Sequence, residues 1–197
     1  MNYYEYKEIE FHIDNPNFLT TQLIIDNSTK DQLTTIVKNS KDTANYHGGY
    51  TFELEDKTFD TLYDTFVIIC KNIFGELYIS EHNRKLCWAN VYNCDSYRSN
   101  LHHHLRTSTI NSVFYLKIPP DNSPNASGLR TVYKNTNYVF IPDELDLVIM
   151  PSWLPHEPLP HNSKENRIAI NMELRCDKPI IDIYSISKIY EKCKIIL

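Results

Sequence analysis

The sequence lacks the features that would connect the protein with a membrane or a nucleic acid. Acidic residues outnumber basic ones, 25 Asp and Glu against 20 Lys and Arg, for a formal net charge of −5. Without a basic field to displace counterions, this charge argues against a nucleic-acid partner. No stretch approaches the roughly 18 apolar residues of a membrane-spanning helix, and residues 1–6 lack the charged start and apolar run of a secretory signal. We therefore expect a cytoplasmic protein with no membrane association.

Cysteines are few and glycines fewer. The five cysteines lie mostly in apolar segments and form no Cys-x-x-Cys pair, which argues against a zinc knuckle or a thioredoxin-like motif and favours reduced, buried thiols. The four glycines stand beside an abundance of Asn, Ile, Lys and Tyr. An AT-rich genome, such as that of a virus, would produce this bias.

The length of 197 residues favours a single domain. Its parts differ in character: residues 1–85 read as strands with supporting helices, residues 86–176 as a run of short strands, and residues 177–197 as an apolar C-terminal extension. The extension must bury its isoleucines, either by adding to the core or by forming the contact of a homodimer.

Two helices are expected in the first part. Residues 30–39 place apolar side chains on one face, and residues 58–74 repeat them at three- and four-residue spacing. Thr58 is the expected cap of the second helix and Gly75 its expected end. Strands are expected before both helices, within residues 8–25.

The pattern of apolar residues changes after residue 86, where short apolar runs alternate with turns rich in Asn, Ser, Asp and Pro. Many short strands at such spacing indicate a sandwich or barrel, with the preceding helices packed outside it. The expected fold class is therefore mainly β (α+β). The expected strands are residues 87–92, 101–105, 111–118, 138–141, 145–150 and 167–174.

Three histidines are candidate metal ligands. If residues 101–105 are extended, His102 and His104 point to the same side, because side chains alternate along a strand. His156 follows a proline at a strand end and could complete the site from a facing strand. Imidazoles bind iron, copper, nickel or zinc, and a site with three ligands leaves an open face for chemistry. The alternative is incidental metal binding by a histidine run at the surface.

Arg167 opens an apolar strand eleven residues after His156. A guanidinium on the inner face of a barrel must be paired, and its planar fork matches a carboxylate. The partner could be the carboxylate of a bound oxo-acid. The alternative is a structural ion pair with Glu144, Asp146 or Glu157.

These motifs together resemble a branch of the 2-oxoglutarate- and Fe(II)-dependent oxygenases. The resemblance rests on residues 88–92, Ser96-Tyr97, His102-x-His104, residues 113–116, residues 147–156 and residues 167–170. It implies a double-stranded β-helix, a jelly roll related to cupins, with Fe(II) bound at its open end. His102 and His156 match two metal ligands of the family, and Arg167 matches the residue that binds the distal carboxylate of 2-oxoglutarate.

The chain departs from the usual family pattern at two positions. His104 stands where most relatives have Asp or Glu, so the expected metal ligands are His102, His104 and His156. Ala169 replaces a hydroxyl residue beside the arginine. The remaining candidates for the oxo-acid pocket are Tyr115, Asn90 and Tyr97.

The resemblance implies a hydroxylase that uses dioxygen on an unknown acceptor and converts 2-oxoglutarate to succinate and CO2. Two alternatives remain open at this point. One is a cupin-type dioxygenase with three histidine ligands that acts without 2-oxoglutarate, and the other is a metal-binding β-sandwich that is not an enzyme.

Overall fold

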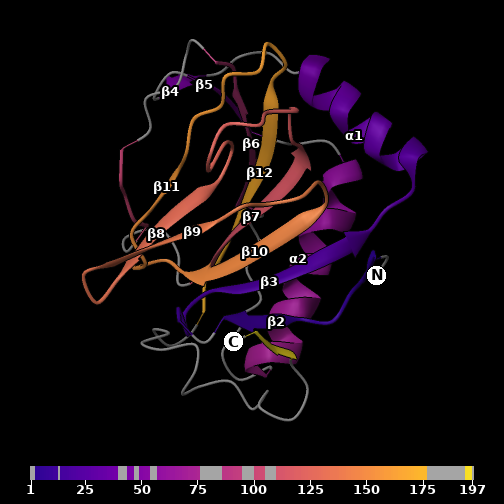
Figure 1. Ribbon diagram of the computed structural model, residues 1–197. Coiled ribbons are helices and arrows are strands. Elements are labelled where there is room, and N and C mark those ends of the chain that lie inside the picture. The colour runs from indigo at the N-terminus through magenta and orange to yellow at the C-terminus, as the bar shows by residue number, and fades with distance from the viewer. Residues whose placement is uncertain are drawn as a thin grey trace.

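The fold was analysed on a computed structural model, which describes residues 3–12, 14–39, 44–46, 49–53, 57–75, 86–94, 100–104, 110–176 and 194–196. Over these residues the chain forms two β-sheets and two helices (Figure 1). No helix among them combines the length and the apolar character that crossing a membrane requires.

The large sheet has its most buried strands at its centre. Its order is β13 (Lys194–Ile196), β2 (Glu10–His12), β3 (Leu19–Ile24), β10 (Asp146–Pro151), β7 (Ile110–Lys117), β12 (Arg167–Leu174), β6 (Leu86–Tyr92), β5 (Gly49–Glu53) and β4 (Ala44–Tyr46), with β1 (Glu5–Tyr6) also paired to β3. All pairs are antiparallel except β13 with β2. Every residue of β12 is buried, because this strand has other protein layers on both of its faces.

The small sheet consists of β11 (His156–Pro158), β8 (Leu129–Tyr133) and β9 (Thr136–Phe140), in the order β11-β8-β9. It lies over one face of the large sheet (Figure 1). Apolar side chains of both sheets meet in an inner core: Phe18, Val113, Tyr115, Leu129, Val148, Met150, Leu154 and Ala169. This is the sandwich expected from the sequence.

Helices α1 (Asn27–Asn39) and α2 (Thr58–Phe74) cover the opposite face of the large sheet (Figure 1). An outer core joins Leu33 of α1 and Phe66 of α2 to the alternate residues of β12, among them Ile168 and Ile170. The period of two in the strand therefore sends one set of side chains to the helices and leaves the other set for the inner face.

The helix ends differ in part from the expectation. Asp26 accepts hydrogen bonds from the backbone N–H of Thr29 at 2.8 Å and from its hydroxyl at 3.0 Å, so α1 begins earlier than expected. Thr58 is not the cap of α2, which follows Lys57 without a side-chain cap. Gly75 ends α2 as expected, with φ 77° and its N–H donated to Lys71 O at 2.8 Å.

The sequence-based strand prediction was wrong for the histidine segment. Of residues 101–105, the first four are described, and only His102 forms a bridge. The prediction also missed β8 and β11. Part of the C-terminal extension joins the large sheet as β13, while a homodimer contact and the division at residues 85 and 176 stay predictions.

Candidate metal centre

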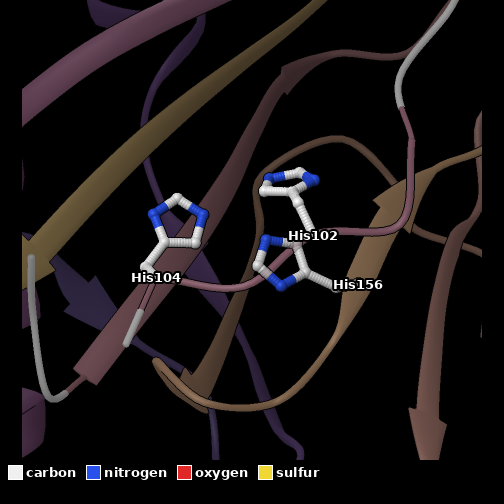
Figure 2. Close-up of side chains that lie close together, drawn as sticks. All are labelled: His102, His104 and His156. Atoms are coloured by element: carbon white, nitrogen blue, oxygen red, sulfur yellow. The ribbon is translucent and has the colours of Figure 1, made fainter. Parts of the chain in front are cut away.

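Three histidines meet between the two sheets. His102 and His104 lie on the segment between β6 and β7, and His156 is the first residue of β11. Each offers one ligand atom, and these atoms all lie within 4.8 Å of one another (Figure 2). The sequence therefore identified three side chains that the fold brings together.

Backbone hydrogen bonds hold the two histidine-bearing segments together. The N–H of His102 donates to His156 O at 3.0 Å, and the N–H of His156 donates to His102 O at 2.9 Å. Two residues on, the N–H of His104 donates to Ser152 O at 2.7 Å. The histidine segment is thus held against the chain leading into β11, and the side chains of His102 and His104 converge although the segment is not a regular strand.

One nitrogen of each ring is occupied by an acceptor. Nδ1 lies 2.9 Å from Asn100 O in His102, 2.9 Å from Leu154 O in His156 and 2.6 Å from Glu173 Oε1 in His104. Carbonyl and carboxylate oxygens only accept, so each Nδ1 carries the proton and each Nε2 keeps its lone pair. Metal-binding histidines are oriented in this way. The three imidazoles therefore fit a divalent transition metal.

His156 is held in its neutral form. It is only 3% exposed, and burial, aided by the charge of His102, lowers its pKa to about 3. A neutral imidazole is the form that binds a metal. No deprotonation is needed before His156 can act as a ligand.

Asn111 on β7 is a neighbour of the site that the sequence analysis did not single out. Its side chain is fully buried, its Nδ2 lies 3.4 Å from His156 Nε2, and its Oδ1 has no hydrogen-bond partner. A polar residue near the start of a mainly apolar strand was the available signal. Asn111 can offer a hydrogen bond to a group bound beside His156.

Arg167 is buried on the inner face of the large sheet, at 1% exposure. Its Nη1 donates to Ser127 O at 3.2 Å and to Leu159 O at 3.1 Å, while its buried Nε has no hydrogen-bond partner. The guanidinium lies 4.4 Å from the centre of the Tyr92 ring. The carbonyl of Leu159 is three residues beyond His156, about 10 Å along an extended chain.

The expected structural ion pairs of Arg167 are not present. Glu144 pairs with Lys30, Glu157 pairs with Arg130, and Asp146 accepts hydrogen bonds from Gln22 and from the backbone of Asp143. In the described part of the chain, no carboxylate pairs with Arg167.

The family comparison agrees with this geometry. Residues 86–173 match the model of the family described as "Putative 2OG-Fe(II) oxygenase". Over this region, which is less than half of the chain, the sequence is similar to the 2OG-Fe(II) oxygenases. No curated protein matches the sequence of the chain.

Solved structures with a similar fold include two prolyl hydroxylases and HygX. A Pseudomonas putida prolyl-4-hydroxylase is 16% identical, with 81% of this chain and 92% of that chain covered and a TM-score of 0.60. The viral collagen prolyl hydroxylase of Paramecium bursaria Chlorella virus-1, solved with 2-oxoglutarate, is 12% identical, with 82% and 97% covered and a TM-score of 0.62. HygX of Streptomyces hygroscopicus, solved with nickel, 2-oxoglutarate and hygromycin B, is 11% identical, with 85% of each chain covered and a TM-score of 0.63.

Several predictions from the sequence are thereby confirmed. The two facing sheets are the double-stranded β-helix of the 2OG-Fe(II) oxygenases. Members of this family are oxidoreductases that depend on Fe(II) and 2-oxoglutarate, the two cofactors expected here. The histidine cluster could hold the metal.

Two of the three further pocket candidates lie beside Ala169 on the neighbouring strands. Ala169 on β12 is paired with Tyr115 on β7 and with Asn90 on β6, in a row across three strands. Tyr115 is buried in the inner core, and Asn90 is half-buried. Tyr97 lies outside the described residues. Contact of these residues with an oxo-acid stays a prediction.

Proposed function

We propose that the protein is an Fe(II)- and 2-oxoglutarate-dependent dioxygenase that hydroxylates an acceptor. In the overall reaction, 2-oxoglutarate, dioxygen and the acceptor C–H group give succinate, CO2 and the hydroxylated acceptor. The observation that carries this proposal is the buried guanidinium of Arg167, with its Nε unsatisfied and no carboxylate partner among the described residues. Three converging imidazoles lie elsewhere in the same fold, and one of them, His156, is buried as well.

Each of these side chains has a defined task. His102, His104 and His156 hold Fe(II) through their Nε2 atoms. Fe(II), when bound, supplies the redox chemistry that activates dioxygen. Arg167 pairs with the distal carboxylate of the oxo-acid, an interaction favoured by the planar guanidinium and the surrounding apolar core.

The neighbouring residues shape the rest of the pocket. Tyr115 and Asn90 flank Ala169, two residues from Arg167, and can hydrogen-bond the oxo-acid in place of the hydroxyl that Ala169 lacks. We assign Tyr97 to the same pocket. The neighbours include prolyl hydroxylases and an enzyme solved with hygromycin B. The choice of acceptor thus resides in the loops around the site, not in the shared sheets.

The proposal is tested by anaerobic reconstitution with Fe(II), followed by titration with 2-oxoglutarate while the visible absorption is recorded. We expect a saturable metal-to-ligand charge-transfer band in the wild-type protein. Arg167→Ala and the bulkier Arg167→Gln should each lose the band at oxo-acid concentrations that saturate the wild type. Arg130→Ala is the matched control, because Arg130 is half-exposed and pairs with Glu157.

The outcomes separate the three functions considered. Iron binding with no such band in the wild type would point to a three-histidine dioxygenase that acts without 2-oxoglutarate. No stoichiometric iron in the wild-type protein would point to a β-fold without this chemistry.

A further inference from the structure

A buried carboxylate stands directly behind one of the three histidines. Glu173, the penultimate residue of β12, is 4% exposed, and its Oε1 lies 2.6 Å from His104 Nδ1. Strand alternation places its side chain on the inner face, together with Arg167 and Ala169. The contact joins residues that are 69 positions apart in the sequence.

Both partners of this contact are held by backbone hydrogen bonds. The Tyr63 hydroxyl donates to Glu173 O at 2.9 Å, which fixes the end of β12 against α2. Glu173 is also paired with Asn111 on β7 and with Leu86 on β6. On the other side, the N–H of His104 is held by Ser152 O. The carboxylate and the imidazole are therefore presented to each other by a rigid framework.

The contact has two physical consequences for a metal ligand. A carboxylate that accepts from Nδ1–H fixes the tautomer, so Nε2 of His104 keeps its lone pair. A short hydrogen bond to an ionised acceptor is also stronger than one to a carbonyl, and it makes the imidazole a more basic ligand. In the other two histidines, Nδ1 lies against a carbonyl oxygen: Asn100 O for His102 and Leu154 O for His156.

The negative charge of Glu173 is the reason that its contact with His104 matters for metal binding. Three neutral imidazoles bring no negative charge to a divalent cation. We propose that Glu173 is a positioning residue that orients the imidazole of His104. Through this imidazole, its carboxylate also provides the negative charge that the three histidine ligands lack. This inference rests on the metal site of the proposed function, but not on the binding of an oxo-acid.

The test is the affinity of the metal-free protein for Co(II), measured by its visible absorption under competition with a chelator. In Glu173→Gln the amide oxygen can still accept from Nδ1–H while the charge is lost, and we expect the Kd to rise about 10-fold. In Glu173→Ala both the acceptor and the charge are lost, and the rise should approach about 100-fold. The Co(II) bands of both variants should also shift.

The matched control is Glu157→Gln, the same substitution next to His156. Glu157 pairs with Arg130 and not with a histidine. The Co(II) affinity of this variant should stay within about twofold of the wild type, since side chains alternate along β11 and Glu157 points away from His156. A fall in affinity equal to that of Glu173→Gln would attribute the effect to general loss of charge, and would overturn the proposal.

A second measurement needs no variant. Nitrogen-15 chemical shifts of the metal-free wild-type protein report which nitrogen of His104 carries the proton, and we expect Nδ1. A proton on Nε2 would overturn the proposal, as would wild-type Co(II) affinity in folded Glu173→Gln and Glu173→Ala. If the wild-type protein itself binds no metal, the proposed function fails as well. If wild-type protein binds metal and the variants match it, only the role of Glu173 fails.

Discussion

His102 and His156 exchange two backbone hydrogen bonds, at 3.0 and 2.9 Å, and their ring centres lie 4.5 Å apart. The two residues are far apart in sequence, and their bridge is the link that closes the site. The same bridge ties an exposed ligand to a buried one. Substitutions at the two positions should therefore affect metal binding alike and stability differently.

The first prediction compares the histidines of the run. His102→Gln should abolish stoichiometric binding of Fe(II) or Co(II) while changing the free energy of unfolding by less than about 0.5 kcal/mol, because the side chain is exposed. His103→Gln is the control, since His103 is exposed and is not part of the described cluster. Metal analysis and denaturant unfolding provide both readouts. Equal metal loss in the two variants would contradict the ligand assignment.

The second prediction concerns pH. Burial lowers the pKa of His156 to about 3 in the folded protein, against about 6.5 in an unfolded chain. Below pH 6.5 the unfolded state therefore binds a proton that the folded state does not, and stability falls as the pH falls. Metal-free protein should lose up to about 1.4 kcal/mol per pH unit between pH 6 and pH 4 from this group.

Urea unfolding at several pH values checks this slope. His156→Gln, which cannot titrate, should show a shallower dependence over the same range. A slope identical to that of the wild type would show that other groups, such as His12, whose pKa burial also lowers, account for the effect.

The sequence predicted which residues form the histidine cluster better than it predicted how the backbone brings them together. His102, His104 and His156 could be selected because imidazole side chains in that order are unusual among apolar strands. Their arrangement depends on hydrogen bonds from the segment to His156 O and Ser152 O, and no local pattern encodes such long-range pairing. The strand over residues 101–105 was expected from the local alternation of short apolar runs and turns. A loop can have the same local pattern.

The partners of buried charged side chains could not be predicted from the sequence either. The period of two along β12 dictates only that Glu173 shares a face with Arg167. Its contact with His104 depends on how the histidine segment crosses the end of β12, a tertiary relationship. By contrast, α2 was predicted with its exact end at Gly75, because helix periodicity and a glycine stop are local signals.

The third prediction tests the start of α1. Asp26→Ala should lower the melting temperature of the protein, because it removes the acceptor of the Thr29 N–H and hydroxyl. Asp26→Asn keeps an oxygen at the cap and should cost less. Thermal unfolding measures both variants, and Co(II) affinity should be the same in each, since α1 lies on the face of the sheet away from the histidines. A loss of affinity would imply that the helix layer controls the site.

The last prediction concerns the support of the oxo-acid pocket. The Tyr92 ring lies beneath the guanidinium of Arg167 at 4.4 Å, and a desolvated cation–π contact of this kind contributes about 2 kcal/mol. Tyr92→Leu should therefore weaken 2-oxoglutarate binding about 10- to 30-fold, with Co(II) affinity unchanged because the metal ligands are not touched. Tyr92→Phe retains an aromatic face and should bind the oxo-acid within a few-fold of the wild type. Calorimetric titration of the Co(II)-loaded proteins gives both constants. Equal losses in Tyr92→Leu and Tyr92→Phe would assign the effect to the phenolic hydroxyl instead of the ring, and no loss in either would show that Tyr92 does not support oxo-acid binding.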